Sequence, residues 1–250
     1  MGLTMSESLR YGKFRFSEAT TEEQRKKIFR LRYEVYALEF GFENPYDFPD
    51  KLERDIYDHY SVHFIALNDD DDIIGTVRMI LNSEKGFPVE HASDINNFID
   101  KPSPEMITEV SRLAVSKMLR RRPEDGIHGI ESYIPKSQGG VSDIPIQNDD
   151  SFKDKRQRPA IILGLYRAVY HKCKELSITH MYMITEDKLF HALYKFGFIF
   201  KQVGSPVEYH GKRTPYATSW KAIEDHMMIN HPDLLEFLLF KLDGKYHPKL

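Results

Sequence analysis

The chain has 250 residues, of which 41% are hydrophobic, so it can form one large domain or two small ones with a sizeable core. Its net charge of −3 excludes a general electrostatic attraction to nucleic acid or anionic membranes. Cys173 is the single cysteine, which excludes an intramolecular disulfide and argues against a cysteine-based zinc site. Neither a secretory signal nor an apolar run of about 20 residues is apparent, so we expect a soluble, cytoplasmic protein.

The first predicted element is a helix over 21–40, whose apolar residues repeat at helical intervals. Thr20 and Glu23 have the spacing of a capping box, and Gly41 is suited to end the helix. The mixed segment 42–60 that follows is rich in acids and aromatics.

A hairpin is predicted next, with strands over 62–67 and 73–81 joined by the polar turn 69–72. Residues 82–106 hold three prolines and should be irregular, with room for one short helix.

The second half alternates strands and helices, which favours one mixed sheet covered by helices. The predicted elements are a buried strand over 107–115, a helix over 160–176 with Pro159 in its first turn, a strand over 180–185, a short helix over 188–196, two strands within 201–220, and a C-terminal helix over 231–242. We therefore predict an α/β (α+β) fold with a mixed central sheet and helices on both faces.

The domain organisation expected is a single domain over 1–250 with its core at about 14–220. An irregular basic insertion is expected at about 117–158, and a helical extension at about 221–250.

Four short motifs follow one another in the first half. Arg32 and Tyr36 lie on the first helix, Asp55 and Asp58 in the acidic segment, and the strand motifs are Gly75-Thr76-Val77-Arg78 and Glu109-Val110-Ser111-Arg112. In this order and spacing they resemble the acyl-homoserine-lactone (autoinducer) synthases and the N-acyl amino acid synthases, which are acyltransferases of the GNAT superfamily.

Two further segments resemble the exosortase-system-associated acyltransferases in particular. They run from Tyr33 to Phe64 and from Pro206 to Pro215. The likeness covers roughly residues 25–220 and implies a GNAT-like acyl-CoA N-acyltransferase fold. Leu193-Tyr194-Lys195-Phe196-Gly197-Phe198 is similar to the end of the last core helix of that fold.

The chain departs from the GNAT pattern at two places. Arg156-Gln157-Arg158-Pro159-Ala160 lacks the glycines of the usual coenzyme A loop, which argues against simple use of acetyl-CoA. Tyr36 stands where the lactone synthases carry phenylalanine, a change that we interpret as conservative packing.

The resemblance places the catalytic motif at Glu109, Ser111 and Arg112. Glu109 is the candidate general base for the attacking amine, directly or through a water. Backbone N–H groups between Leu113 and Val115 are candidates to stabilise the oxyanion of the acyl donor. The structural alternative is that Glu109 pairs with an arginine and holds the strand.

Candidate acceptor-binding residues are Arg32, Tyr36, Asp55, Asp58 and Arg78. Together with Arg112, the arginines suit the carboxylate of an amino acid, since a guanidinium binds that group with two hydrogen bonds. The two aspartates suit its ammonium. Internal ion pairs and turn caps are the structural alternatives.

Arg30 is a weaker candidate for binding the acceptor's carboxylate. Tyr194 stands where many GNAT enzymes place a general acid. Because a thiol of pKa about 8.5 departs easily, we expect Tyr194 to be a core residue instead.

Two basic clusters are candidates to bind the acyl donor. Their residues are Lys117, Arg120, Arg121, Arg122, Lys153, Lys155, Arg156 and Arg158. Such clusters suit the acidic acyl carrier protein or the phosphates of coenzyme A, and a solvated loop is the alternative. We expect no nucleic-acid partner.

No metal site is expected, since the one candidate set, Asp55, Asp58, His59 and His63, includes a residue of a strand. The apolar run from Leu234 to Phe240 should pack on the domain, with a dimer contact or shallow membrane association as alternatives.

The function that we predict is transfer of a long acyl chain from acyl carrier protein, or acyl-CoA, to a small-molecule amine. The co-substrate would be an acyl-phosphopantetheine or acyl-CoA, with no tightly bound cofactor. Alternatives are an acyl-homoserine-lactone synthase that uses S-adenosylmethionine, a short-chain coenzyme A N-acetyltransferase, and a non-catalytic module that binds acyl carrier protein.

Overall fold

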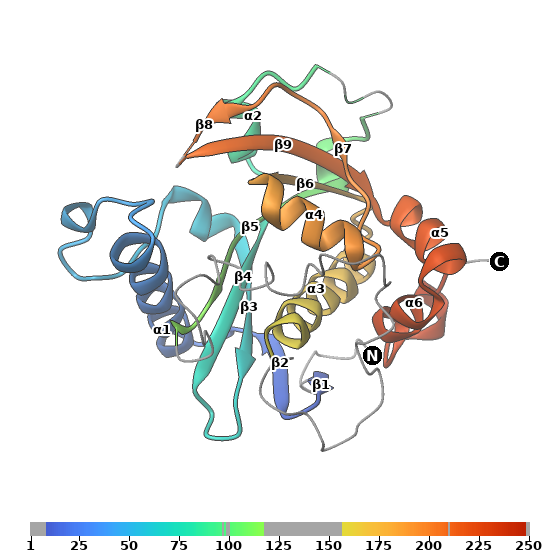
Figure 1. The fold of residues 1–250 in the computed structure, drawn as a ribbon, viewed down its shortest axis with the longest axis horizontal. Helices are drawn as coiled ribbons and strands as arrows, with labels where there is room; N and C mark the ends of the chain where they lie inside the picture. The colour runs from blue at the N-terminus through green and yellow to red at the C-terminus, as the bar shows by residue number, and fades with distance from the viewer. Residues whose placement is uncertain (1–8, 97, 99–100, 118–156, 210, 249–250) are drawn as a thin grey trace. The chain divides into compact units, whose positions relative to one another are not determined.

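The computed structural model describes residues 9–96, 98, 101–117, 157–209 and 211–248 (Figure 1). These residues form two compact units. The first contains the described residues up to Met79, those from Arg112 to 117, and the start of the long helix α3 up to Ala168. The second contains 80–111 and the described residues from Val169 onwards. The expected single domain stays a prediction.

The first unit begins with two short strands that the sequence analysis did not predict. Its elements are β1 (Leu9–Tyr11), β2 (Phe14–Glu18), α1 (Glu22–Arg32), η1 (Tyr33–Glu39), η2 (Pro45–Asp47), η3 (Ile56–Tyr60), β3 (Ser61–Leu67) and β4 (Ile73–Leu81), the last of which extends into the second unit. Hydrogen bonds join the strands in the order β1-β2-β3-β4, and the pairs β1–β2 and β2–β3 are antiparallel. The predicted hairpin is confirmed in β3 and β4 (Figure 1).

The first predicted helix is two elements rather than one. The α-helix ends at Arg32, and a π-helix, η1, follows, in which the Phe40 N–H donates to the carbonyl of Val35 at 3.1 Å. The predicted capping box was wrong by one residue. Thr21 is the N-cap, because it is the last residue with extended backbone, and its partner is Gln24, whose side-chain oxygen accepts from the Thr21 N–H at 3.1 Å.

The second unit contains the remaining elements, both those predicted from the sequence and those that were not. They are α2 (Pro88–Ala92), η4 (Pro104–Met106), β5 (Ile107–Val115), α3 (Gln157–Glu175), β6 (His180–Thr185), α4 (Asp187–Lys195), β7 (Lys201–Gln202), β8 (Val207–Glu208), β9 (Lys212–Ser219), α5 (Trp220–Asn230), α6 (Pro232–Leu239) and η8 (Gly244–Tyr246). β5 and α3 each contribute residues to both units.

The strand order in this unit is β5-β6-β9-β7, with β8 also paired to β9. β6 is parallel to β5 and antiparallel to β9, so the sheet is mixed, and the predicted fold class is confirmed. Residues 201–219 hold three strands where two were predicted. The predicted helix over 231–242 ends at Leu239, and α5 before it was not predicted.

Each unit has its own core. In the first, Gly164 of α3 lies against Phe16 of β2, and a Cβ at this glycine would lie 2.2 Å from the Phe16 ring. In the second, Leu234 and Leu238 of α6 are buried, as expected for a helix that packs on its domain, whereas Phe240 after it is exposed.

Candidate active site

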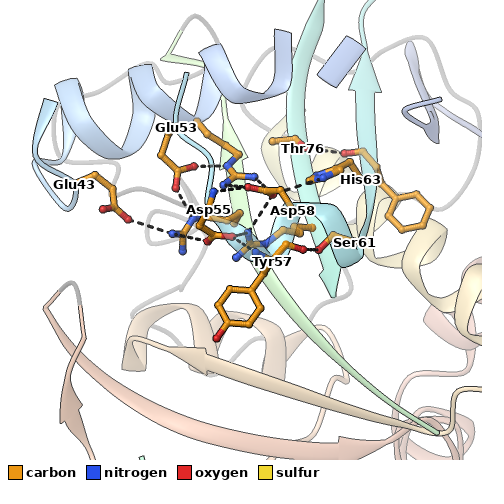
Figure 2. Close-up of polar contacts among 12 residues, drawn as sticks. Glu43, Glu53, Asp55, Tyr57, Asp58, Ser61, His63 and Thr76 are labelled. Carbon is orange, nitrogen blue, oxygen red and sulfur yellow. Dashed lines mark hydrogen bonds and ion pairs between the residues drawn. The ribbon is translucent and has the colours of Figure 1, made fainter. Parts of the chain in front are cut away.

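A cluster of buried charges in the first unit brings together most of the predicted acceptor-binding residues (Figure 2). We call it the ionic cluster, and its members are Arg32, Arg78, Arg112, Glu43, Glu53, Asp55 and Asp58. The acids come from the irregular segment between η1 and β3, and the arginines from α1, β4 and β5.

Arg32 is the most deeply buried arginine of the cluster, with a fully buried side chain. Its Nε donates to Glu53, and its Nη1 and Nη2 donate to the two carboxylate oxygens of Asp58 at 2.6 and 3.1 Å. Burial acts to lower the pKa of Arg32, but the Glu53 and Asp58 carboxylates outweigh it and raise the pKa. This arginine is therefore charged and held by two acids.

Arg78 on β4 is also buried and shares one of these acids. Its Nη1 donates to Asp55 at 2.7 Å and to Asp58 at 3.1 Å. Asp55 and Asp58 also form the capping box of η3. The Tyr57 N–H donates to Asp55 at 2.9 Å, and the Asp55 N–H donates to Asp58 at 2.8 Å. The two aspartates thus perform both structural roles that were weighed for them, turn cap and ion-pair partner.

Arg112 on β5 lies at the more exposed edge of the cluster, with a side chain that is 14% exposed. Its Nε donates to Glu53 at 2.9 Å, and its Nη2 lies 3.2 Å from Glu43 and 3.5 Å from Asp55. Its guanidinium also lies 5.7 Å from the centre of the Tyr36 ring. Asp55, whose side chain is 29% exposed, is therefore beside the most accessible guanidinium of the cluster.

Two acids of the cluster, Glu53 and Asp58, are held in their charged form. Burial acts to raise the pKa of Glu53, but the guanidiniums of Arg32 and Arg112 outweigh it and lower the pKa to about 2. For Asp58, burial is likewise outweighed by Arg32 and Arg78, which place its pKa well below the usual range. Among the described residues, four carboxylates therefore meet three guanidiniums, a formal charge of −1.

His63 on β3 lies at the inner edge of this cluster and is 3% exposed. Its Nε2 is 3.6 Å from Asp58, and neither ring nitrogen has a hydrogen-bond partner in the described part of the chain. Burial first, and then the charge of Arg32, lower the pKa of His63 to about 4 despite the nearby carboxylate. The imidazole is therefore neutral at pH 7 and adds no charge to the cluster.

Glu109, the candidate general base, belongs to the second unit and is 1% exposed. Its Oε2 accepts a hydrogen bond of 2.9 Å from the backbone N–H of Val89 at the start of α2. On β5 it stands opposite Tyr182 of β6, the last pair of a parallel ladder that begins at Ile107 and His180. One oxygen of the carboxylate is thus held by a backbone N–H.

β5 departs from regular strand geometry at Arg112, three residues after Glu109. Arg112 has a φ of +52°, in the left-handed region that a residue with a side chain rarely adopts. Ser111 and Arg112 are partly exposed, whereas Leu113 to Val115 are buried. The Tyr36 hydroxyl donates to the carbonyl of Leu113 at 2.8 Å.

Several predicted site residues lie outside the ionic cluster. Arg30 lines a separate cavity of about 900 Å³ in the first unit, together with Lys13, Lys26 and Leu31. Tyr194 is 52% exposed, so the expectation of a core tyrosine was wrong, because this side of α4 faces solvent.

The basic clusters are mostly beyond the described residues. Arg120, Arg121, Arg122, Lys153, Lys155 and Arg156 lie outside them, and so does the side chain of Arg158 in the first turn of α3. Lys117, which is described, is exposed. Across the ranges that the structure describes, no group of three or more histidines, cysteines or acids could hold a metal ion.

Two acids of this cluster, Glu43 and Glu53, were not predicted from the sequence as functional candidates, and His63 was weighed there only as a metal ligand. The sequence did carry a signal for further acids. Three arginines were expected to lie close together, and the two aspartates assigned to them leave one positive charge without a partner. The dense acids of 42–60 are the nearest source of the missing charge.

Known proteins resemble this chain in part of its sequence and in its fold. Residues 31–125 match the family model described as an acetyltransferase (GNAT) domain, a range that includes the motif residues from Arg32 to Arg112. No curated protein sequence matches the chain. No helix in the described ranges is long and apolar enough to cross a membrane.

Solved structures with the same fold include three of interest. TofI, in a ternary complex with an inhibitor and MTA, is 14% identical, covers 94% of this chain and 100% of its own, and has a TM-score of 0.58. BjaI, a CoA-dependent acyl-homoserine lactone synthase with SAM and isopentyl-CoA, is 20% identical, with coverages of 92% and 89% and a TM-score of 0.54. FeeM, an N-acyl amino acid synthase from uncultured soil microbes, is 13% identical, with coverages of 85% and 93% and a TM-score of 0.51. The matches confirm the expected GNAT fold and the expectation of an enzyme of the acyltransferase class.

Proposed function

We propose that this protein is an N-acyltransferase that moves a long-chain acyl group from acyl carrier protein, or from acyl-CoA, to the amine of an amino acid or a related small molecule. The observation that carries the proposal is the pairing of Asp55 and Arg112 at the accessible edge of the ionic cluster, 3.5 Å apart. An α-amino acid presents an ammonium and a carboxylate a few bonds apart. A partly exposed acid beside a partly exposed guanidinium complements both groups.

The other arginines of the cluster have a supporting role in this proposal. Arg32 and Arg78 are buried and already bound by Glu53, Asp55 and Asp58, so an acceptor carboxylate would have to displace an internal one. Arg112 is more accessible than either, because its side chain is 14% exposed. We therefore assign the acceptor's carboxylate to Arg112 and its ammonium to Asp55.

The chemistry assigned to β5 is the acyl transfer itself. Glu109 takes a proton from the acceptor's ammonium, directly or through a water, so that the neutral amine attacks the thioester carbonyl. Backbone N–H groups between Leu113 and Val115 stabilise the oxyanion that forms. The attack itself forms the C–N bond. Collapse of the tetrahedral intermediate re-forms the C=O bond and breaks the C–S bond, and the departing thiolate takes up the second proton that the nitrogen loses, so the products are an amide and a thiol.

The acyl donor is assigned from the sequence around α3. The stretch 156–160 lacks the glycines that bind coenzyme A in ordinary GNAT enzymes, and basic residues flank it. Acyl carrier protein is acidic and carries its acyl chain on phosphopantetheine, so it suits this composition. Acyl-CoA remains the second donor to test, since BjaI is a CoA-dependent synthase.

One specific observation favours a second candidate acceptor, S-adenosylmethionine, which would make the product an acyl-homoserine lactone. Its sulfonium adds a positive charge to those of an amino acid. The formal charge of −1 counted for the ionic cluster among the described residues suits such a cation.

The test is a product analysis with purified protein. Long-chain acyl carrier protein and, separately, long-chain acyl-CoA and acetyl-CoA are incubated with pooled amino acids or with S-adenosylmethionine, and products are identified by mass spectrometry. An N-acyl amino acid is the expected product and names the acceptor. A lactone would establish the second candidate, and acetylated products from acetyl-CoA alone would establish a short-chain enzyme. Binding of acyl carrier protein without turnover on any amine would overturn the proposal in favour of a binding module.

A further inference from the structure

Tyr36 joins the ionic cluster to the irregular part of β5. The two neighbouring residues of β5, Arg112 and Leu113, both contact it. The ring lies 5.7 Å from the Arg112 guanidinium, and the hydroxyl donates to the Leu113 carbonyl at 2.8 Å. All three residues belong to the first unit.

The π-helix η1 sets the position of Tyr36. Because the Phe40 N–H bonds to Val35 instead of Tyr36, the carbonyl of Tyr36 is left to accept from Phe42 at 2.8 Å and Glu43 at 3.2 Å. The Phe42 ring lies 6.4 Å from the Tyr36 ring. The same residue thus fixes, through its backbone, the segment that brings Glu43 to Arg112.

The Leu113 carbonyl is a sensitive place for a hydrogen bond. The left-handed φ of Arg112 interrupts the regular strand geometry one residue before the Leu113–Ala114 peptide, so the hydrogen bond to the Leu113 carbonyl adds a second constraint on this peptide. A peptide unit is planar and trans, so a hydrogen bond to the Leu113 carbonyl also fixes the direction of the Ala114 N–H on its opposite side. That N–H belongs to the group assigned to the oxyanion.

We propose that Tyr36 is a positioning residue for acyl transfer: its hydroxyl fixes the Leu113–Ala114 peptide after the irregular turn of β5, and its ring fixes the Arg112 guanidinium. This inference rests on the proposed function. The sequence alone suggested that Tyr36 packs as phenylalanine would, which leaves its phenolic oxygen without a role. The present proposal gives that oxygen a role. A preorganised donor stabilises a developing oxyanion more than a donor that must reorient during the reaction.

Tyr36→Phe tests the proposal, because it removes one oxygen and keeps the ring beside Arg112. Tyr33→Phe is the matched control, since Tyr33 is 6% exposed on the same π-helix and packs against Phe48 with ring centres 6.3 Å apart. Two measurements are made on both variants. One is the kcat and KM for acyl donor and for amine, and the other is the ¹³C shift of the Leu113 carbonyl with the ¹⁵N shift of the Ala114 amide.

We expect Tyr36→Phe to lower kcat about tenfold, less than the roughly 10²–10³-fold loss of a direct oxyanion donor, with the KM of the amine unchanged. The two NMR shifts should move in Tyr36→Phe and not in Tyr33→Phe. Unchanged shifts would overturn the proposal, and so would a kcat within twofold of wild type. A third outcome is that the shifts move but neither wild type nor variant acylates any amine. In that case the proposed function is wrong, and the hydrogen bond from Tyr36 still determines the orientation of this peptide.

Discussion

Two groups of buried charge, one in each unit, differ in composition and in access to solvent. In the second unit, Glu224 is 4% exposed, accepts from the Tyr170 hydroxyl at 2.7 Å and lies 2.5 Å from Lys174. One acid meets one cation there, so the group is balanced. In the ionic cluster, acids outnumber arginines among the described residues, and side-chain exposure increases from 1% at Glu53 to 29% at Asp55.

We interpret the difference as that between a structural group and a candidate site. A balanced pair needs no ligand, because the acid and the cation neutralise each other. The ionic cluster has two parts. Its buried part resembles the group around Glu224, and at its outer edge Asp55 and Arg112 are partly exposed to solvent. We interpret the buried part, Arg32 with Glu53 and Asp58, as the support for that edge.

The largest expected effect is on stability, and it compares the buried charges of the two groups. Arg32→Met should destabilise the protein by about 3–5 kcal/mol, because it leaves Glu53 and Asp58 buried without their main partner. Glu224→Gln should cost only about 1 kcal/mol, since the amide oxygen still accepts from Tyr170 and Lys174, at 20% exposure, reaches water. Urea unfolding followed by circular dichroism measures both. Equal losses would mean that the two groups are equivalent.

The next effect is a pH dependence carried by His63. Its folded pKa of about 4 lies below the unfolded value of about 6.5, so as the pH falls the unfolded chain binds this proton first. Stability is fully present above about pH 6.5 and should decrease by about 3 kcal/mol as the pH falls to about 4. The groups around the imidazole are Asp58, Arg32 and Arg78.

His63→Gln isolates this contribution. The unfolding free energies of wild type and variant are measured from pH 8 to pH 3. Above about pH 6.5 the two should depend on pH in the same way, and between about pH 6.5 and 4 the wild type should lose more stability than the variant. The carboxylates act in a lower window: Glu53, with a folded pKa of about 2, loses its contribution as the pH falls below about 4.5. Parallel curves across the whole range would contradict the neutral, buried state of His63.

A smaller effect is expected at the outer edge of the cluster. Arg112→Ala should lower kcat/KM for the acceptor by about 10- to 100-fold, the range expected for losing hydrogen bonds to a charged group. Arg54→Ala is the control, because Arg54 is half-exposed and pairs with Asp50. Steady-state kinetics with the acceptor that the product analysis names measure the change. Unaltered turnover and acceptor affinity in Arg112→Ala would remove the carboxylate assignment.

The smallest effect is expected from Asp55→Asn. The variant keeps an oxygen that accepts from the Tyr57 N–H and loses only the charge, so the fold should change little. The KM of the amine should rise about tenfold, which corresponds to about 1.4 kcal/mol. Asp47→Asn, at an exposed position of η2, is the control. Equal KM values for all three proteins would show that Asp55 serves only η3 and Arg78.

Much of the fold could be predicted from the sequence, because the longer elements carry their own signals. Apolar periodicity and flanking turn residues indicated α1, the β3–β4 hairpin, β5, α3, β6 and α4. The elements that were missed depend on tertiary context. β1 has three residues, too few for a pattern, and α5 follows β9 directly with Ser219 as its N-cap, so no loop marked its start.

The ionic cluster was predictable in its arginines and aspartates and unpredictable in its geometry, and its role as a site stays a prediction. Motif order placed Arg32, Arg78 and Arg112 together because it reflects a shared fold. The left-handed φ of Arg112 depends on packing that is not encoded in a local pattern. The partnership of Glu53 with two arginines depends on where an irregular segment folds back, and single-sequence reasoning does not determine such paths.

The π-helix η1 has a consequence for insertions and deletions in this protein. A turn that closes from residue 40 to residue 35 holds one residue more than an α-turn, so deleting one residue between Tyr33 and Glu39 would restore ordinary helix. The same deletion within Glu22–Arg32 would rotate Arg32 by about 100° away from its acids. An alignment of this chain with relatives should therefore place a single-residue gap within η1, where the backbone can absorb it.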